Sequence, residues 1–234
     1  MLRRRPDSAQ AHFVMSYVYR YAGMLEQSTI ECDKALALDP GSYTFRSCAW
    51  SFMELGNTKR AADLIRLDAG SEWATYVKPS LLLREGDIAK AREAVRQMPA
   101  NPRYHRDLLE ACLGMRTPAE ADRMARAAET TAPTTSDPEV LYYLGTLFAY
   151  CGKQQAALRL LQSAIEQQYC AYSNLQLDPL LRKLRSAPGY DKLLNAAKEC
   201  QKTLIGVSRT ESMLRDVRPN IPIYEQAKAD AKLQ

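Results

Sequence analysis

The chain has 234 residues, of which 46% are hydrophobic and 25% are charged, and its formal net charge is +5. This length and apolar content predict one large domain or two small ones with a real core, so a disordered chain is excluded. The mild basic excess permits an acidic partner but does not indicate nucleic acid. Two histidines, His12 and His105, leave little for His-based metal or acid–base chemistry. The aromatic set is unusual: 13 Tyr and 2 Trp stand against 4 Phe.

The six cysteines are spread along the chain without a Cys-x-x-Cys pair. Disulfide frameworks belong to short secreted chains, and no signal peptide is recognisable, so we expect reduced thiols in a soluble, cytoplasmic protein. Cys32, Cys48 and Cys112 fall at helix packing positions, where a free Cys acts as a small hydrophobe. No run of 18 apolar residues is present, so no membrane span is expected. A helix expected almost at the start, near Ser8, is also what a piece of a longer chain would show.

A helix–turn–helix pattern recurs along the chain. The first unit, at 9–40, has its turn at Gly23 and ends in Leu38-Asp39-Pro40. The second turns at Gly56, and the third turns at Gly86 with its first helix disturbed by Pro79, which leaves open whether that helix is intact. The fourth is less regular and ends near Pro133. The small residues of the five second helices are spaced by 33, 30, 30 and 36 positions; they are Ser28, Ala61, Ala91, Ala121 and Ala157.

The fifth unit shows the pattern most clearly. Its first helix carries Leu141, Leu144, Gly145 and Phe148 at i, i+3, i+4 and i+7, which is the spacing of one helix face. Asp137-Pro138 supplies an N-cap and an N1 proline. Gly152 is the turn, and Ala157, Leu161 and Ala164 form one face of the second helix. Five such units predict an all-α repeat array.

The C-terminal third differs. Asp178-Pro179 predicts a helix start, Pro188-Gly189 a break, and residues 190–204 a further helix. Beyond about Ser208 the chain is polar, with one more short helix expected near 224–233. We therefore divide the chain into a repeat array at 7–168, capping helices at 169–207 and a polar tail at 208–234.

The repeat resembles the tetratricopeptide repeat (TPR) family, whose order of large residue, Leu-Gly, aromatic, turn Gly, Ala, large residue and Ala is carried by residues 141–164, while the closing Pro of the family pattern is matched by Pro40 in the first unit. The resemblance implies an α-solenoid of about five antiparallel helix pairs, whose concave face holds a partner peptide or protein. The capping segment, with Asp178-Pro179 and Leu181-Arg182, resembles the one that closes TPR arrays of bacterial signalling proteins, such as receptor-type serine/threonine kinases and winged-helix regulators.

Beside the packing stripe, each first helix carries a second stripe rich in aromatic and arginine residues. The resemblance implies that this stripe lines the concave groove and binds the partner. Tyr, Trp and Arg are the residues that dominate binding hot spots, and arginines in a row are not expected in a core. The alternative is that the aromatics only fill the inner curve of the array. The predicted partner-binding residues are Phe13, Tyr17, Arg20, Tyr21, Tyr43, Arg46, Trp50, Trp73, Tyr76, Arg84, Arg103, Arg106, Tyr142 and Tyr150.

Searches for phosphate-binding loops, zinc-protease, hydrolase and kinase motifs find none in the sequence. We expect a non-enzymatic interaction module without cofactor or metal, part of a larger signalling protein, whose partner has apolar and acidic features. Two alternatives stay open. An RNA-binding helical repeat would use the basic charge and the aromatics, although the irregular spacing makes nucleic acid unlikely. Self-association would use the open packing face of the first unit.

Overall fold

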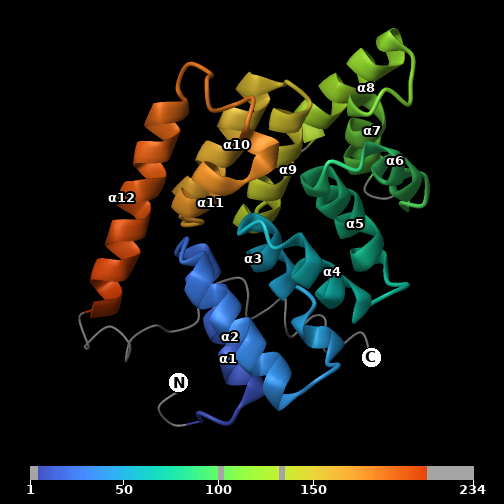
Figure 1. Cartoon of the computed structure of the whole chain (residues 1–234). Coiled ribbons are helices and arrows are strands. Elements are labelled where there is room, and N and C mark those ends of the chain that lie inside the picture. Colours follow the sequence, from blue (N-terminus) through green and yellow to red (C-terminus); the bar gives the residue numbers. More distant parts are fainter. Residues whose placement is uncertain (1–4, 100–102, 132–134, 210–234) are drawn as a thin grey trace.

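The structure is a computed structural model that describes residues 5–99, 103–131 and 135–209 (Figure 1). Throughout these ranges the regular structure is helical and no strand occurs, which confirms the all-α prediction. The tail predicted at 208–234, including its short helix, lies outside the described residues except for 208 and 209, which end the last helix. No helix within the described ranges combines the length and apolar character needed to cross a membrane.

Consecutive helices pack against each other in five pairs: α1 with α2, α3 with α4, α5 with α6, α7 with α8, and α9 with α10. A C-terminal group of α11, η3 and α12 follows them. The helices are α1 (Ala9–Tyr21), α2 (Leu25–Leu38), η1 (Tyr43–Phe45), α3 (Cys48–Glu54), α4 (Thr58–Arg66), α5 (Glu72–Glu85), α6 (Ile88–Arg96), α7 (Arg103–Cys112), α8 (Pro118–Thr131), α9 (Pro138–Tyr150), α10 (Gln154–Glu166), α11 (Tyr172–Leu177), η3 (Pro179–Leu181) and α12 (Tyr190–Arg209).

Local sequence explains where the helices begin and turn. The Ser71 hydroxyl accepts from the Ala74 N–H at the start of α5, and Asp137 accepts from the first turn of α9. The predicted turn glycines lie between the helices of a pair with positive φ, 78° at Gly86 and 75° at Gly152, a conformation that other residues rarely adopt. The helix pairs therefore follow from short-range signals in the sequence.

Small residues allow the paired helices to approach. Ser28, Ala61, Ala91 and Ala157 are all fully buried in their second helices, as their recurrence predicted, whereas Ala121 is half-buried. At Gly145 in α9, an added Cβ would lie 2.8 Å from Cγ of Leu161 in α10. That separation is shorter than a carbon–carbon contact allows, so glycine is required there by packing, not by backbone conformation.

The structure answers one open question and corrects one prediction for individual helices. The third unit is intact around Pro79, because α5 continues through it from Glu72 to Glu85. Pro79 lies among buried residues on both sides, and their packing offsets the loss of one backbone N–H donor. The helix expected to start at Asp178 is a single 3₁₀ turn, η3, whose cap is Asp178 itself.

The C-terminal group packs on the last pair and also reaches the first. Helix α12 contacts α10 and α11. In Figure 1 the blue first pair lies next to the orange C-terminal helices. Gln201 Nε2 on α12 donates to the carbonyl oxygens of Ala22 and Gly23 at 3.1 and 3.0 Å, and the Cys170 N–H donates to the Tyr21 carbonyl at 2.7 Å. The chain thus curves until its C-terminal group meets the turn of its first pair.

The expectation of reduced cysteines was wrong, because all six form disulfides: Cys32–Cys48, Cys112–Cys151 and Cys170–Cys200. The Cα–Cα distances of 5.9, 5.1 and 5.3 Å are those of ordinary disulfides. The first bond joins α2 to α3, the second joins the ends of α7 and α9, and the third joins the segment before α11 to α12. Each bond therefore connects elements beyond a single helix pair.

Candidate interaction surface

The predicted aromatic and arginine stripe divides into a buried part and an accessible part. Four of its members are buried: Arg20, Trp50, Arg84 and Tyr142. Nine are half-buried or exposed: Phe13, Tyr17, Tyr21, Tyr43, Arg46, Trp73, Tyr76, Arg106 and Tyr150. Arg103 opens α7, but its side chain lies outside the described part of the chain.

Arg20 is at the centre of the buried part. Its Nε lies 2.5 Å from Oε1 of Glu139 on α9, and its Nη1 donates to the Ser47 carbonyl and the Ser51 hydroxyl at 3.1 and 3.3 Å. The guanidinium also lies over the ring of Tyr17 at 4.2 Å. Burial alone would lower the pKa of Arg20, but the carboxylate of Glu139 raises it above its ordinary value. Arg20 therefore stays charged and connects α1 with α3 and α9.

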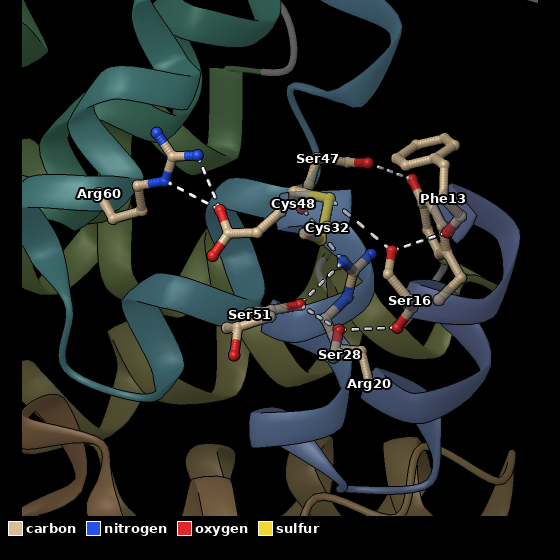
Figure 2. Close-up of a disulfide and its surroundings, with 12 residues drawn as sticks. Phe13, Ser16, Arg20, Ser28, Cys32, Ser47, Cys48, Ser51 and Arg60 are labelled. Carbon is tan, nitrogen blue, oxygen red and sulfur yellow. Dashed lines mark hydrogen bonds and ion pairs between the residues drawn. A yellow bond between two sulfur atoms is a disulfide. The ribbon is translucent and has the colours of Figure 1, made fainter. Parts of the chain in front are cut away.

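The first disulfide lies beside this arginine, and Figure 2 shows both with the serines that surround them. Ser28 donates to the Ser16 carbonyl at 2.7 Å and shares a 2.7 Å hydrogen bond with Ser51, which in turn accepts from Arg20. Ser16 lies 3.7 Å from the Cys48 sulfur. Hydroxyl groups thus satisfy one another where α1, α2 and α3 meet, and that interface holds Arg20 in place.

A second buried centre forms around Glu54, the last residue of α3. The Tyr169 hydroxyl donates to both carboxyl oxygens at 3.0 and 3.2 Å, and Asn174 Nδ2 on α11 donates to Oε2. Burial raises the pKa of Glu54 to about 8, with Arg20 acting in the opposite direction. Glu54 is therefore mostly neutral at pH 7. Because Tyr169 and Asn174 follow the last pair in the chain, this centre fixes the C-terminal group against the second pair.

The third buried centre is the ion pair of Arg84 and Asp178. Arg84 Nη2 on α5 donates to Asp178 Oδ2 at 2.6 Å, and both side chains are almost fully buried. Tyr142 on α9 reaches the same carboxylate oxygen at 3.5 Å. Asp178 Oδ1 accepts from the Leu180 N–H at 3.0 Å, so one carboxylate both caps η3 and neutralises an arginine from the third pair.

These three centres correct the picture of an open, arginine-lined groove. The inner ends of α1, α3 and α5 are covered by α9, α11 and η3, so Arg20, Trp50, Arg84 and Tyr142 contact the chain itself in this structure. The argument that arginines have no place in a core fails at Arg20 and Arg84 because each pairs with a carboxylate, the half-buried Glu139 and the buried Asp178. Sequence reasoning missed those partners. Of these partners only Asp178 was recognisable in the sequence, and there as the N-cap of a helix starting at Pro179, not as the partner of an arginine.

The accessible part contains a stacked group on the second and third units. The Arg46 guanidinium lies 5.8 Å from the ring of Tyr43 and 5.6 Å from the ring of Trp73. Asp68 holds Arg46 in that position through a 3.2 Å contact with Nη1. Tyr43 is 39% exposed, and the other two side chains are half-buried. We call Tyr43, Arg46 and Trp73 the stacked patch.

Four of the other accessible members contact side chains or backbone within the fold, on their own helix or on another element. Phe13 contacts Tyr17 and Phe45 with ring centroids 5.1 and 5.0 Å apart, and Tyr21 contacts Tyr169 at 5.0 Å. Arg106 donates to Glu110 at 2.9 Å and to the Met98 carbonyl. Tyr76 stacks on His105 at 5.6 Å. Side chains of this set therefore also pack within the fold, as the alternative interpretation of the stripe expected.

Both histidines have structural partners. His12 Nδ1 lies 2.5 Å from Glu31 Oε2, and its Nε2 lies 2.9 Å from the Pro6 carbonyl, so both ring nitrogens have a partner. His105 Nε2 lies 2.6 Å from the Tyr143 hydroxyl, and burial lowers the pKa of His105 to about 3. His105 is thus neutral at physiological pH. Among the described residues, no three His, Cys, Asp or Glu side chains come together as metal ligands would.

No protein-family model matches the chain, and no curated protein matches it. Function is therefore inferred from the geometry of the chain itself.

Proposed function

We propose that the protein is a non-enzymatic interaction module of TPR-like helix pairs, arranged as an α-solenoid and serving as a scaffold or sensory part of a larger signalling protein. The five consecutive pairs, their positive-φ turn glycines and their buried small residues support the repeat assignment. The observation that carries the binding function is the stacked patch, in which two aromatic rings and an arginine from neighbouring units are held together at the surface.

The stacked patch has the properties of a binding hot spot. Tyr and Trp offer large rigid surfaces that lose little conformational entropy on binding, and Arg46 is already fixed by Asp68. Truncation of a central aromatic in such a patch typically costs about 2 kcal/mol or more of binding free energy. We propose a partner peptide or protein with an apolar anchor that packs on Trp73.

The disulfides bear on where the module works. Structural disulfides persist in oxidising compartments and are rare in the cytosol. Because all six cysteines are paired, we propose an oxidising compartment in place of the cytoplasmic location expected from the sequence.

The binding function is tested with a displayed library of random short peptides. Peptides selected on the wild-type protein should lose about 30-fold in affinity for Trp73→Ala, the equivalent of about 2 kcal/mol. Arg96→Ala, which removes an exposed arginine of α6 that pairs with Glu93, is the matched control and should change nothing. Circular dichroism checks that both variants stay folded. Selected peptides that bind Trp73→Ala and Arg46→Ala as well as wild type would refute this assignment.

Self-association is a second candidate, because α1 carries an apolar edge. Val14 is 36% exposed and Val18, one turn later on the same helix face, is 46% exposed. The first unit of a repeat array leaves a packing face that another copy would cover. Sedimentation should then show a concentration-dependent dimer that Val18→Asp abolishes. A wild-type monomer at every concentration argues against this role.

A further inference from the structure

A cleft opens beside the Arg84–Asp178 pair, between the C-terminal ends of α5 and α9 and the residues that follow η3. Leu83 and Arg84 line it from α5, Tyr150 from α9, and Leu180, Arg182 and Lys183 from the C-terminal group. We call this the basic cleft. Glu85 also lines it and is the one carboxylate among the lining residues.

The rim of the basic cleft carries two cations. Arg182 and Lys183 are exposed, and neither lies within ion-pair distance of a carboxylate among the described residues. Lys183 Nζ lies 5.9 Å from the centre of the Tyr150 ring, so one cation of the rim is positioned over an aromatic face. By contrast, the exposed basic residues Lys90 and Arg96 of α6 are each paired with an acidic neighbour on the same helix or at its start. The basic cleft therefore has a net positive charge, with the two unpaired cations Arg182 and Lys183 against the single carboxylate of Glu85.

Arg84 adds a second, independent observation. Its Nη1 and Nη2 are engaged by Ser80 and Asp178, but its Nε is a buried donor with no acceptor among the described residues. A buried donor without a partner destabilises the fold. Arg84 also lines the basic cleft, so this unpaired donor belongs to a side chain that borders the space a ligand would occupy.

The remaining lining residues indicate the kind of ligand. Leu83 and Leu180, which are only 4% and 3% exposed, and the half-buried Pro179 form an apolar floor beside the cations. A free inorganic anion makes no use of that surface, whereas a peptide with an apolar side chain next to a carboxylate uses both. An arginine and a carboxylate can form two parallel hydrogen bonds, and this geometry fixes the orientation of the bound peptide.

We propose that the basic cleft binds an acidic peptide segment, with a carboxylate at Arg182 and Lys183 and an adjacent apolar side chain on Leu83 and Leu180. This inference rests on the proposed interaction function and adds to it a place for the acidic feature of the partner, separate from the stacked patch.

The test uses a fluorescent peptide of alternating Glu and Leu and a matched peptide of Gln and Leu, with binding to the full chain followed by anisotropy at low ionic strength. We expect the Glu peptide to bind and the Gln peptide to bind at least about tenfold more weakly, since a hydrogen bond to a charged group contributes about 1.5–3 kcal/mol. Arg182→Gln with Lys183→Gln should remove the preference for Glu. Lys90→Gln with Arg96→Gln removes the same charge from α6 and should leave it unchanged.

Three outcomes would overturn the proposal. Equal loss in the α6 control would mean that net charge alone attracts the peptide. Displacement of the peptide by inorganic phosphate, but not by chloride at equal ionic strength, would mean a phosphate site. An unchanged preference in the cleft variant would place the acidic contact elsewhere. If the cleft proposal is overturned but Trp73→Ala still weakens the binding of library-selected peptides, the proposed interaction function at the stacked patch is retained.

Discussion

Asp178→Asn should destabilise the fold far more than the removal of one surface charge. Asp178 is fully buried, and its Oδ2 lies 2.6 Å from Arg84 Nη2 while its Oδ1 caps η3 at the Leu180 N–H. Asparagine keeps the size and an acceptor for the cap. It removes the negative charge and leaves the Arg84 guanidinium buried without a counter-ion.

The magnitude follows from that isolated charge. Breaking a buried ion pair by removing one partner costs about 3–5 kcal/mol, because the remaining charge stays desolvated. Asp178→Ala also removes the cap and should cost about 1 kcal/mol more. The double variant Arg84→Met with Asp178→Asn leaves no orphaned charge, so its loss should be smaller than the sum of the two single losses.

Urea denaturation followed by circular dichroism measures these losses, with the slope m confirming that the unfolding reaction is unchanged. Asp33→Asn is the matched control, because Asp33 also pairs with an arginine, Arg60, at 2.7 Å but is exposed to solvent. That substitution should cost about 1 kcal/mol or less. A loss below about 1 kcal/mol for Asp178→Asn, or strict additivity in the double variant, would refute the reasoning.

Three further predictions follow from the packing and the buried groups. Burial raises the pKa of Glu54 from 4.5 in the unfolded chain to about 8 in the fold, so between pH 4.5 and pH 8 unfolding releases a proton from Glu54. The free energy of unfolding should therefore fall by roughly 1 kcal/mol per pH unit between these two values and level off at higher pH. Glu54→Gln should flatten this slope in urea titrations at several pH values, and an unchanged slope contradicts the assignment. Gly145→Ala should destabilise the fold by about 1–3 kcal/mol, because the added methyl group overpacks the contact with Leu161. Gly206→Ala in α12 has open space around it and should stabilise the fold by up to about 1 kcal/mol. Thermal melts measure both changes, and a change of stability in the same direction for both variants would disprove the packing argument. Replacing Cys112 and Cys151 together by Ser should cost about 4 kcal/mol, as expected for a bond that spans 39 positions, and a thiol titration of the native wild type that finds free Cys would show the pairing wrong.

The helix pairs were predictable because their signals are local. A cap such as Asp137, a turn glycine such as Gly152 and an apolar face spaced by three and four residues all lie within one unit of sequence. Pro79 could not be judged from such local signals. Proline normally disturbs a helix interior, but the buried neighbours of Pro79 on both sides keep α5 continuous.

The disulfides and the buried ion pairs were not predictable from such signals. Cys32 and Cys48 are brought within 5.9 Å by the packing of α2 on α3, and nothing in their spacing shows it. Arg84 and Asp178 are 94 positions apart and meet only because the C-terminal group folds back over the inner face of the array. Of the candidate site, sequence could therefore identify the residue types but not which of them the fold would cover.

This covering decides where a partner can bind. For a partner to reach Arg20, helix α9 would have to move away, which breaks the ion pair of Arg20 with Glu139 at about 3–5 kcal/mol. A peptide that binds with a micromolar Kd has only about 8 kcal/mol of binding free energy in total. Opening the inner face at Arg20 would use about half of it. Binding at the stacked patch and the basic cleft requires no such opening, because both already lie at the surface, and recognition is therefore expected there with the inner face kept closed.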